Sequence, residues 1–471
     1  MTKVLIAVAA LCLALPGSGF AGSATSRWDL TIGGYVKVDA GFTSQASGPA
    51  AAGLEQYWPD RDNAGRDQNV ANKSGSFDMA TGQTALNFLV KGPDTWGAKS
   101  TAFIQGNFLG VTTNSGTAGA RYGTFTMTHA YMDLTWPATK LTVGQTWQSW
   151  GFLPSYTFLG VYDLLMAGRG NTVPQITVTR NFGTGFRGSI GIQEPYNSRD
   201  QIGGSANLAT AQSPLGMSSV VGFNTSSVRV TTDIPDFTAE IDFTSEAAGK
   251  IGPQALQLAL GGFWGQDNII YTDTTRTAAY NVAHATRWAT ALKAFVPLIP
   301  EKNLNKAGAL SLSGSVWTGQ NLANWFLGAR NIIAPIPYDQ SMVNGRAHYT
   351  TPVTSGGWGQ ISYHITDKVY VNGLYGYTRN SVSAGYQGLY PNQIKQWQQI
   401  IGNVIYDANA AVRVGVEYNY TTATFNAPGL NNGGLAAPPS EQLTGYTPAA
   451  GTSLGSTGKV HQGRIAVWYF F

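Results

Sequence analysis

The sequence is poor in charged residues, which make up 11% of its 471 positions, whereas a typical soluble domain has roughly 25%. Its mean hydropathy of −0.09 is nevertheless too polar for a bundle of membrane-spanning helices. Glycine is abundant, at 58 residues, and aromatic residues reach 12%. This composition is typical of a β-barrel whose strands alternate lipid-facing and water-facing side chains. The formal charge of +4 is too small to indicate a nucleic-acid partner.

Cysteine is nearly absent, and the single one, Cys12, lies in an N-terminal export signal. Lys3 gives a positive start, residues 4–15 are apolar, and residues 19–21 form a small-x-small cleavage site. The apolar stretch is shorter than the roughly 20 residues of a membrane-spanning helix, and the residue before Cys12 is too large for a lipoprotein signal. We therefore predict that residues 1–21 are a signal peptide. The mature chain would have no disulfide and would depend on backbone pairing and packing for its stability.

The remainder of the chain has no apolar run near 18 residues, so any membrane crossing must use strands. Between residues 27 and 42 apolar residues occupy every second position, opposite a polar set that contains Lys37 and Asp39. The same period-two alternation recurs through the sequence, for example at 86–91, 130–136, 241–243, 288–296 and 412–420. About sixteen such segments can be counted, which predicts an all-β fold: an antiparallel transmembrane β-barrel over residues 22–471.

The connections between these segments alternate between short and long, as they do in outer-membrane barrels. Short turns are expected at 93–95, 137–139, 183–185, 366–367 and 407–408, on the periplasmic side. Long segments rich in glycine, asparagine, serine and proline are expected to be extracellular loops: 43–82, 109–121, 146–173, 194–235, 266–283, 320–354, 380–398 and 426–457. Residues 226–234 are strand-like, but a strand there would put the later long loops on the periplasmic side. We place them inside the fourth long loop.

The last strand ends the chain on an aromatic residue. Ile465, Val467, Tyr469 and Phe471 alternate with polar residues that include Arg464. Such an ending resembles the terminal aromatic strand that the barrel-assembly machinery reads, which marks Phe471 as a barrel-insertion signal. This strand is expected to pair with the first one, around residue 35, and so to close the barrel.

Two short motifs resemble a known family. Residues 33–40, GGYVKVDA, look like the opening of DcaP-like porins, and residues 144–147, GQTW, are similar to the lead-in to their constriction loop. The resemblance implies a homotrimer of sixteen-stranded channels in the outer membrane of a Gram-negative bacterium, surrounded by lipid and lipopolysaccharide. It also implies passage of small, often anionic solutes.

Charged residues on the water-facing parity are the candidates for lining the pore. They include Lys37, Asp39, Lys99, Arg187, Arg287, Lys293, Arg413, Glu417 and Arg464. Their balance leans positive, which would favour anions. The alternative is that these charges pair with one another, Lys37 with Asp39 and Arg413 with Glu417, and leave little net field.

The segment 148–173 is the candidate constriction loop. It follows the fifth predicted strand and contains aromatic and aliphatic residues, among them Trp150, that require burial. Asp163 and Arg169 carry the charges expected at the narrowest point of the pore. The alternative is that this apolar loop packs on a neighbouring protomer.

Enzymatic motifs occur without the context that they require. Residues 183–188 match G-x-G-x-x-G but precede a strand, where a dinucleotide site needs a helix. Residues 451–455 match G-x-S-x-G but lie in a loop, where an esterase needs a strand–turn–helix elbow. The five histidines show no metal-binding spacing. Asp60 and Asp62 resemble part of a calcium loop, but other ligand positions are missing.

We therefore predict a non-enzymatic porin without a cofactor, calcium near Asp60 being the one candidate. It would be a passive diffusion channel for small hydrophilic solutes, with a lumen charge that leans toward anions. The alternatives are an outer-membrane barrel with a structural or adhesive role and a barrel esterase.

Overall fold

The fold is taken from a computed structural model of the whole chain. The structure describes residues 28–44, 75–110, 124–151, 153, 155–158, 172–195, 229–272, 280–320, 322, 341–343, 346–348, 353–381, 394–425, 429–430, 453–454 and 457–471. The predicted signal peptide, Asp60, Asp62, Asp163 and Arg169 lie outside these residues.

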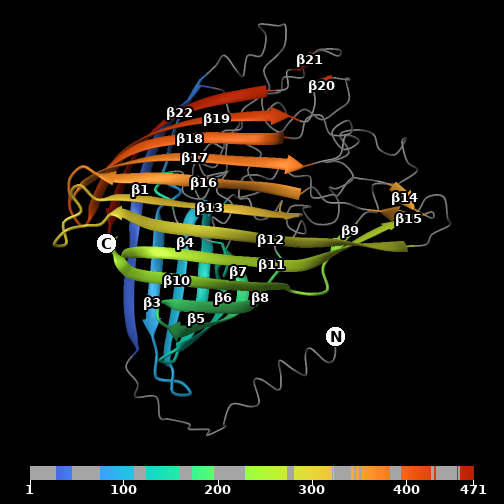
Figure 1. Cartoon of the computed structure of the whole chain (residues 1–471), viewed down its shortest axis with the longest axis horizontal. Helices are drawn as coiled ribbons and strands as arrows, with labels where there is room; N and C mark the ends of the chain where they lie inside the picture. The colour runs from blue at the N-terminus through green and yellow to red at the C-terminus, as the bar shows by residue number, and fades with distance from the viewer. Residues whose placement is uncertain are drawn as a thin grey trace.

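Sixteen antiparallel strands close into one barrel, as predicted (Figure 1). In chain order they are β1 (Asp29–Thr43), β3 (Ala85–Lys91), β4 (Lys99–Gly110), β5 (Thr124–Thr135), β6 (Thr139–Trp147), β7 (Thr172–Gly183), β8 (Phe186–Gln193), β10 (Asp236–Ile251), β11 (Gln254–Thr272), β12 (Tyr280–Ile299), β13 (Leu310–Gln320), β16 (Val353–His364), β17 (Val369–Ser381), β18 (Ile394–Asp407), β19 (Val412–Phe425) and β22 (Thr457–Phe470). Each pairs with its neighbour in sequence, the arrangement that short hairpin turns produce.

Two further segments extend barrel strands. β2 (Ser76–Ala80) pairs with the half of β1 that lies beyond β3, and β9 (Arg229–Thr231) pairs with the part of β11 that lies beyond β10. The placement of residues 226–234 entirely inside a loop was therefore wrong in part. β9 continues the line of β10, so it adds no crossing and the even strand number is kept.

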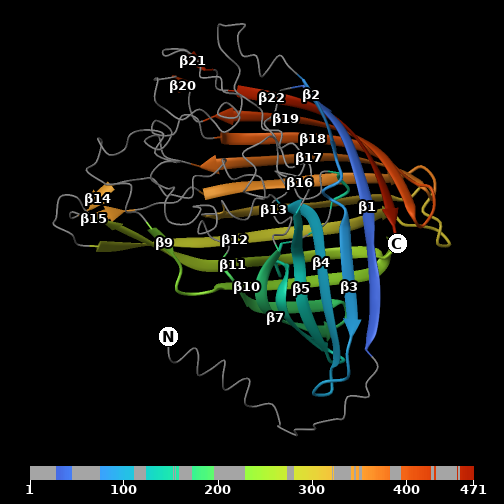
Figure 2. The same ribbon diagram turned by 180° about the vertical axis from the view of Figure 1, so that it is seen from behind.

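The first and last strands close the barrel as predicted. Tyr35 is opposite Phe470, and the register continues to Thr43 opposite Gln462. The backbones of Gly34 and Phe471 exchange two hydrogen bonds of 3.1 Å. Figure 2 shows β1 lying against β22 along this seam.

The two faces of the wall are opposite in character, because successive side chains of a strand point to opposite sides. On β22 the apolar residues Ile465 and Val467 are about half exposed on the outside, whereas Gln462 and Arg464 point inward and are buried. An apolar outer face with a polar interior is the arrangement of a transmembrane barrel. Within the described residues no helix is long and apolar enough to cross a membrane.

The connections differ from prediction in two places. The β11–β12 hairpin extends through most of the expected loop 266–283, so that only residues 273–279 separate the two strands. The turn expected at 93–95 extends further, because Trp96 lies in it with a positive φ of 52° and β4 begins only at Lys99. Residues 184–185 form the turn of the β7–β8 hairpin, within the turn that the sequence indicated at 183–185. Small hairpins made of β14 (Ser341–Val343) with β15 (Arg346–His348), and of β20 (Gly429–Leu430) with β21 (Ser453–Leu454), lie in long connections.

Candidate functional site: the barrel interior

The loop that follows β6 runs inside the barrel along its wall. Ser149 is hydrogen-bonded to Thr238 of β10 at 2.8 Å, and the backbone N–H of Gly151 donates to Glu240 of the same strand at 2.7 Å. Trp150 is 3% exposed, and its ring centroid lies 5.1 Å from that of Phe263 on β11. The loop therefore turns inward directly after β6.

Further along, the loop contacts strands that lie about 200 residues later in the chain. Leu153 packs in a buried cluster with Trp358, Leu374 and Ile401, from β16, β17 and β18. The backbone N–H of Tyr156 donates to Gln360 Oε1 of β16 at 2.8 Å. The described part of the loop is thus packed on the inner wall of the chain's own barrel.

Phe158 fixes the loop at the closing seam. Its N–H donates to Glu417 of β19 at 2.9 Å, and its carbonyl oxygen accepts from Lys37 of β1 at 2.6 Å. Its ring is buried, 5.1 Å from that of Trp468 on β22. A Cβ at Gly415 would collide with the Phe158 ring, so glycine at this position provides the space that the ring fills.

Buried ion pairs also lie on this side of the interior. Arg287 and Asp236 pair at 2.9 Å with side chains 1% and 0% exposed. Lys37 and Asp39 pair at 3.1 Å, also buried. Burying unpaired charges would cost several kcal/mol, so pairing is the condition for packing them against the wall. We call the interior along β10–β22 and β1, including the docked loop, the filled half.

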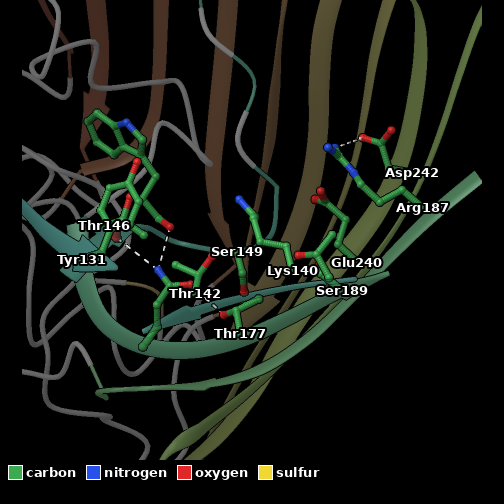
Figure 3. Close-up of a pocket in the computed structure, with 13 residues that line it drawn as sticks. Tyr131, Lys140, Thr142, Thr146, Ser149, Thr177, Arg187, Ser189, Glu240 and Asp242 are labelled. Carbon is green, nitrogen blue, oxygen red and sulfur yellow. Dashed lines mark hydrogen bonds and ion pairs between the residues drawn. The ribbon is translucent and has the colours of Figure 1, made fainter. Parts of the chain in front are cut away.

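The opposite side of the interior holds an open cavity of about 260 Å³ along β5–β8, which reaches to Ser149 of the loop and to Glu240 and Asp242 of β10, where the two sides meet (Figure 3). We call it the open half. Its lining is mostly hydroxyl-bearing and charged: Tyr131, Lys140, Thr142, Thr146, Trp147, Ser149, Gln175, Thr177, Thr179, Arg187, Ser189, Glu240 and Asp242. A water-filled channel requires a polar lining of this kind.

Cations and carboxylates of the open half differ in exposure. The Arg187 side chain is 53% exposed, but its partner Asp242, at 3.2 Å, is 4% exposed. Lys140 is 43% exposed, and its partner Asp133, at 3.4 Å, is 15% exposed. Asp242 also accepts from Gln257 at 2.6 Å. The water in this half therefore meets the cations more than their counter-charges.

The predicted site residues divide between these regions. Lys37, Asp39, Arg287, Lys293, Glu417 and Arg464 are buried on the inner face in the filled half. Arg187 borders the open cavity. Lys99 is 77% exposed at the rim, paired with Asp94 of the turn at 2.8 Å. Its inward parity is correct, but it lies at the end of its strand.

The alternative that paired Arg413 with Glu417 was wrong. Arg413 pairs with Asp407 at 2.5 Å, across the β18–β19 turn, and Glu417 instead accepts from Phe158 and Asn403. The sequence prediction of pore-lining charges did not include Lys140, which borders the cavity. Its inward parity, two residues before Thr142, would have identified it. The described residues contain no group of three or more histidine, cysteine, aspartate or glutamate side chains suited to a metal ion.

Solved structures with a similar fold include an outer-membrane channel. The outer membrane channel DcaP of Acinetobacter baumannii is 15% identical, with 97% of this chain and 100% of that chain covered and a TM-score of 0.61. The fold is that of an outer-membrane β-barrel. The resemblance to DcaP-like porins seen in two sequence motifs thus extends to the whole fold.

Two other structures align over similar lengths. OmpT of Vibrio cholerae is 10% identical, covering 96% of this chain and 99% of that chain, with a TM-score of 0.47. OprB of Pseudomonas putida is 10% identical, covering 94% of both chains, with a TM-score of 0.45. Because these scores are below 0.5, the fold comparison rests on DcaP. No family model matches the chain, and no curated protein matches it significantly.

Proposed function

We propose that the protein is a passive outer-membrane channel for small hydrophilic solutes, that it catalyses no reaction, and that it favours anions. The observation that carries the proposal is the exposure difference in the open half: Lys140 and Arg187 extend into the cavity while Asp133 and Asp242 are largely covered. A passing anion therefore meets a cationic surface although the ion pairs are formally neutral.

The filled half supports this proposal because it leaves only the open half for solutes to pass through. The loop from Gln148 to Phe158 contacts the wall between β10 and β1, and the charges beneath it are buried. Solutes are therefore confined to the side of β5–β8, where selectivity comes from lumen charge and pore width.

Planar-bilayer recording of the purified barrel tests the proposal. We expect stable single-channel currents and a reversal potential in a KCl gradient that indicates chloride preference. The double substitution Lys140→Gln with Arg187→Gln should move that potential toward cation preference, since the buried carboxylates remain. Lys99→Gln, at the rim and paired with an exposed partner, is the matched control.

Two outcomes would contradict the proposal. Electrical silence of a correctly folded sample would favour the structural or adhesive alternative. Chloride preference that survives the double substitution unchanged would refute the assignment of selectivity to the open half.

We extend the proposal to a homotrimer in the outer membrane, supported by the resemblance of the first strand to DcaP-like porins. In this assembly lipopolysaccharide and lipid contact the apolar outer face, and the terminal strand ending at Phe471 serves the barrel-assembly machinery. The mass of the detergent-extracted protein, measured by native mass spectrometry, tests the trimer: a monomeric mass would overturn it.

A further inference from the structure

We propose that the wall of the open half formed by β6, β7 and β8 binds small polyhydroxylated carboxylates, such as sugar acids, as they pass. This inference rests on the proposed channel function and names a solute class for it. The feature that carries it is a row of hydroxyl groups next to the two exposed cations (Figure 3).

Strand register sets this row. Lys140 of β6 is opposite Thr179 of β7, and Thr179 is opposite Ser189 of β8. Adjacent strands lie about 4.8 Å apart, so the row spans about 10 Å from the lysine to the serine backbone. Arg187 lies two residues from Ser189 on the same strand and the same face. A carboxylate bound by either cation thus leaves the rest of the solute alongside the hydroxyls.

A second row follows along the same wall. Thr142 of β6 is opposite Thr177 of β7. The Thr142 hydroxyl donates to Asp133 at 2.5 Å, and the Thr177 hydroxyl donates to Gln175 at 2.8 Å. Thr142 and Thr177 are themselves buried, so this second row holds the wall together behind the first row, which carries the contacts with the solute.

The lining also disfavours other solute classes. Among the described residues that line the cavity, none is aliphatic and only Tyr131 and Trp147 are aromatic. An apolar carboxylate would satisfy the cations and cover the hydroxyls without replacing their hydrogen bonds to water, which is unfavourable. A neutral sugar would form hydrogen bonds with the hydroxyls but would bring no negative charge to the cations. A solute that carries both groups matches the whole wall.

The test uses three probes on single wild-type channels in a bilayer: gluconate, hexanoate and glucose. Each is titrated into the bath while interruptions of the chloride current are counted. We expect gluconate to interrupt the current at a concentration about tenfold lower than either hexanoate or glucose, as two added hydrogen bonds permit. Equal potency of gluconate and hexanoate would overturn the inference.

Variants locate the site. Thr179→Val with Ser189→Ala removes the hydroxyl row with little change in side-chain size, and should lower gluconate potency to that of hexanoate. Ser313→Ala, buried on the inner face of β13 in the filled half, is the matched control and should leave the titration unchanged. Gluconate potency that survives the double substitution would overturn the assignment to this wall.

The failures are distinguishable. The chloride preference of the wild-type channel in a salt gradient tests the proposed function by itself. Chloride preference together with equal potency of the three probes would leave the channel function in place and reject the hydroxyl row.

Discussion

The two halves of the barrel interior differ in how far their inward-facing charged side chains are exposed to water. In the filled half a charge such as Arg287 is almost fully covered and bonded to an equally covered Asp236. In the open half Arg187 keeps more than half of its side chain exposed, although it too has a carboxylate partner. The parity of a strand position therefore decides whether its side chain faces the lipid or the barrel interior. Whether it then meets water depends on where the loop after β6 lies.

The largest expected difference between the halves is in stability. Arg287→Met would leave Asp236 buried without its counter-charge, and we expect a loss of about 3–5 kcal/mol in the free energy of unfolding. Lys99→Met, which breaks the exposed rim pair with Asp94, should cost about 1 kcal/mol or less. Urea unfolding in lipid vesicles measures both. Equal losses would mean that burial does not separate these pairs.

The next effect concerns the docked loop. Phe158→Ala removes the buried ring that fills the space at Gly415, a change that costs about 3–5 kcal/mol in a packed core. We expect the loop to leave the seam part of the time, so that the single-channel current fluctuates between levels. Phe186→Ala, on the outer face and 44% exposed, is the control. A steady wild-type current in the Phe158 variant would show that the anchor is dispensable.

A smaller effect separates buried from exposed cations in selectivity. Lys140→Gln removes a charge that passing anions approach, an interaction of about 1 kcal/mol at 4 Å in water. Lys37→Gln removes a charge that is already bonded to Asp39 and to the Phe158 carbonyl beneath the loop. Among variants that insert and conduct, reversal potentials should shift more for Lys140. A larger shift for Lys37 would place the passage in the filled half.

The smallest expected effect is that of salt. The Debye length falls from about 10 Å at 0.1 M to about 3 Å at 1 M ionic strength, so exposed cations attract anions less at high salt. Reversal potentials measured at a fixed concentration ratio should therefore indicate weaker chloride preference as the mean salt concentration rises. Preference that is independent of salt would point to pore width instead of the exposed charges.

Much of the fold could be predicted because alternation is a local property. The parity of Lys37 or Arg464 follows from neighbours two residues away, and it placed both on the inner face. The pairing of the first and last strands also followed, since a barrel with short turns has one remaining pair of edges to join.

The site could be predicted less well, because it depends on residues far apart in the chain. The alternative that Arg413 pairs with Glu417 rested on their proximity in sequence, but same-face positions four apart on a strand are separated by about 13 Å. The turn brings Asp407 to Arg413, and the loop brings the Phe158 backbone to Glu417. Likewise, the burial of Lys37 depends on a loop residue 121 positions away.

The sequence by itself determined the barrel, its two faces and its closure, because a period of two fixes the side of the sheet on which each residue lies. Only the tertiary structure decided which inward charges are covered and which meet water. Strand register and loop docking set those distances, and neither is encoded in the parity of a single strand.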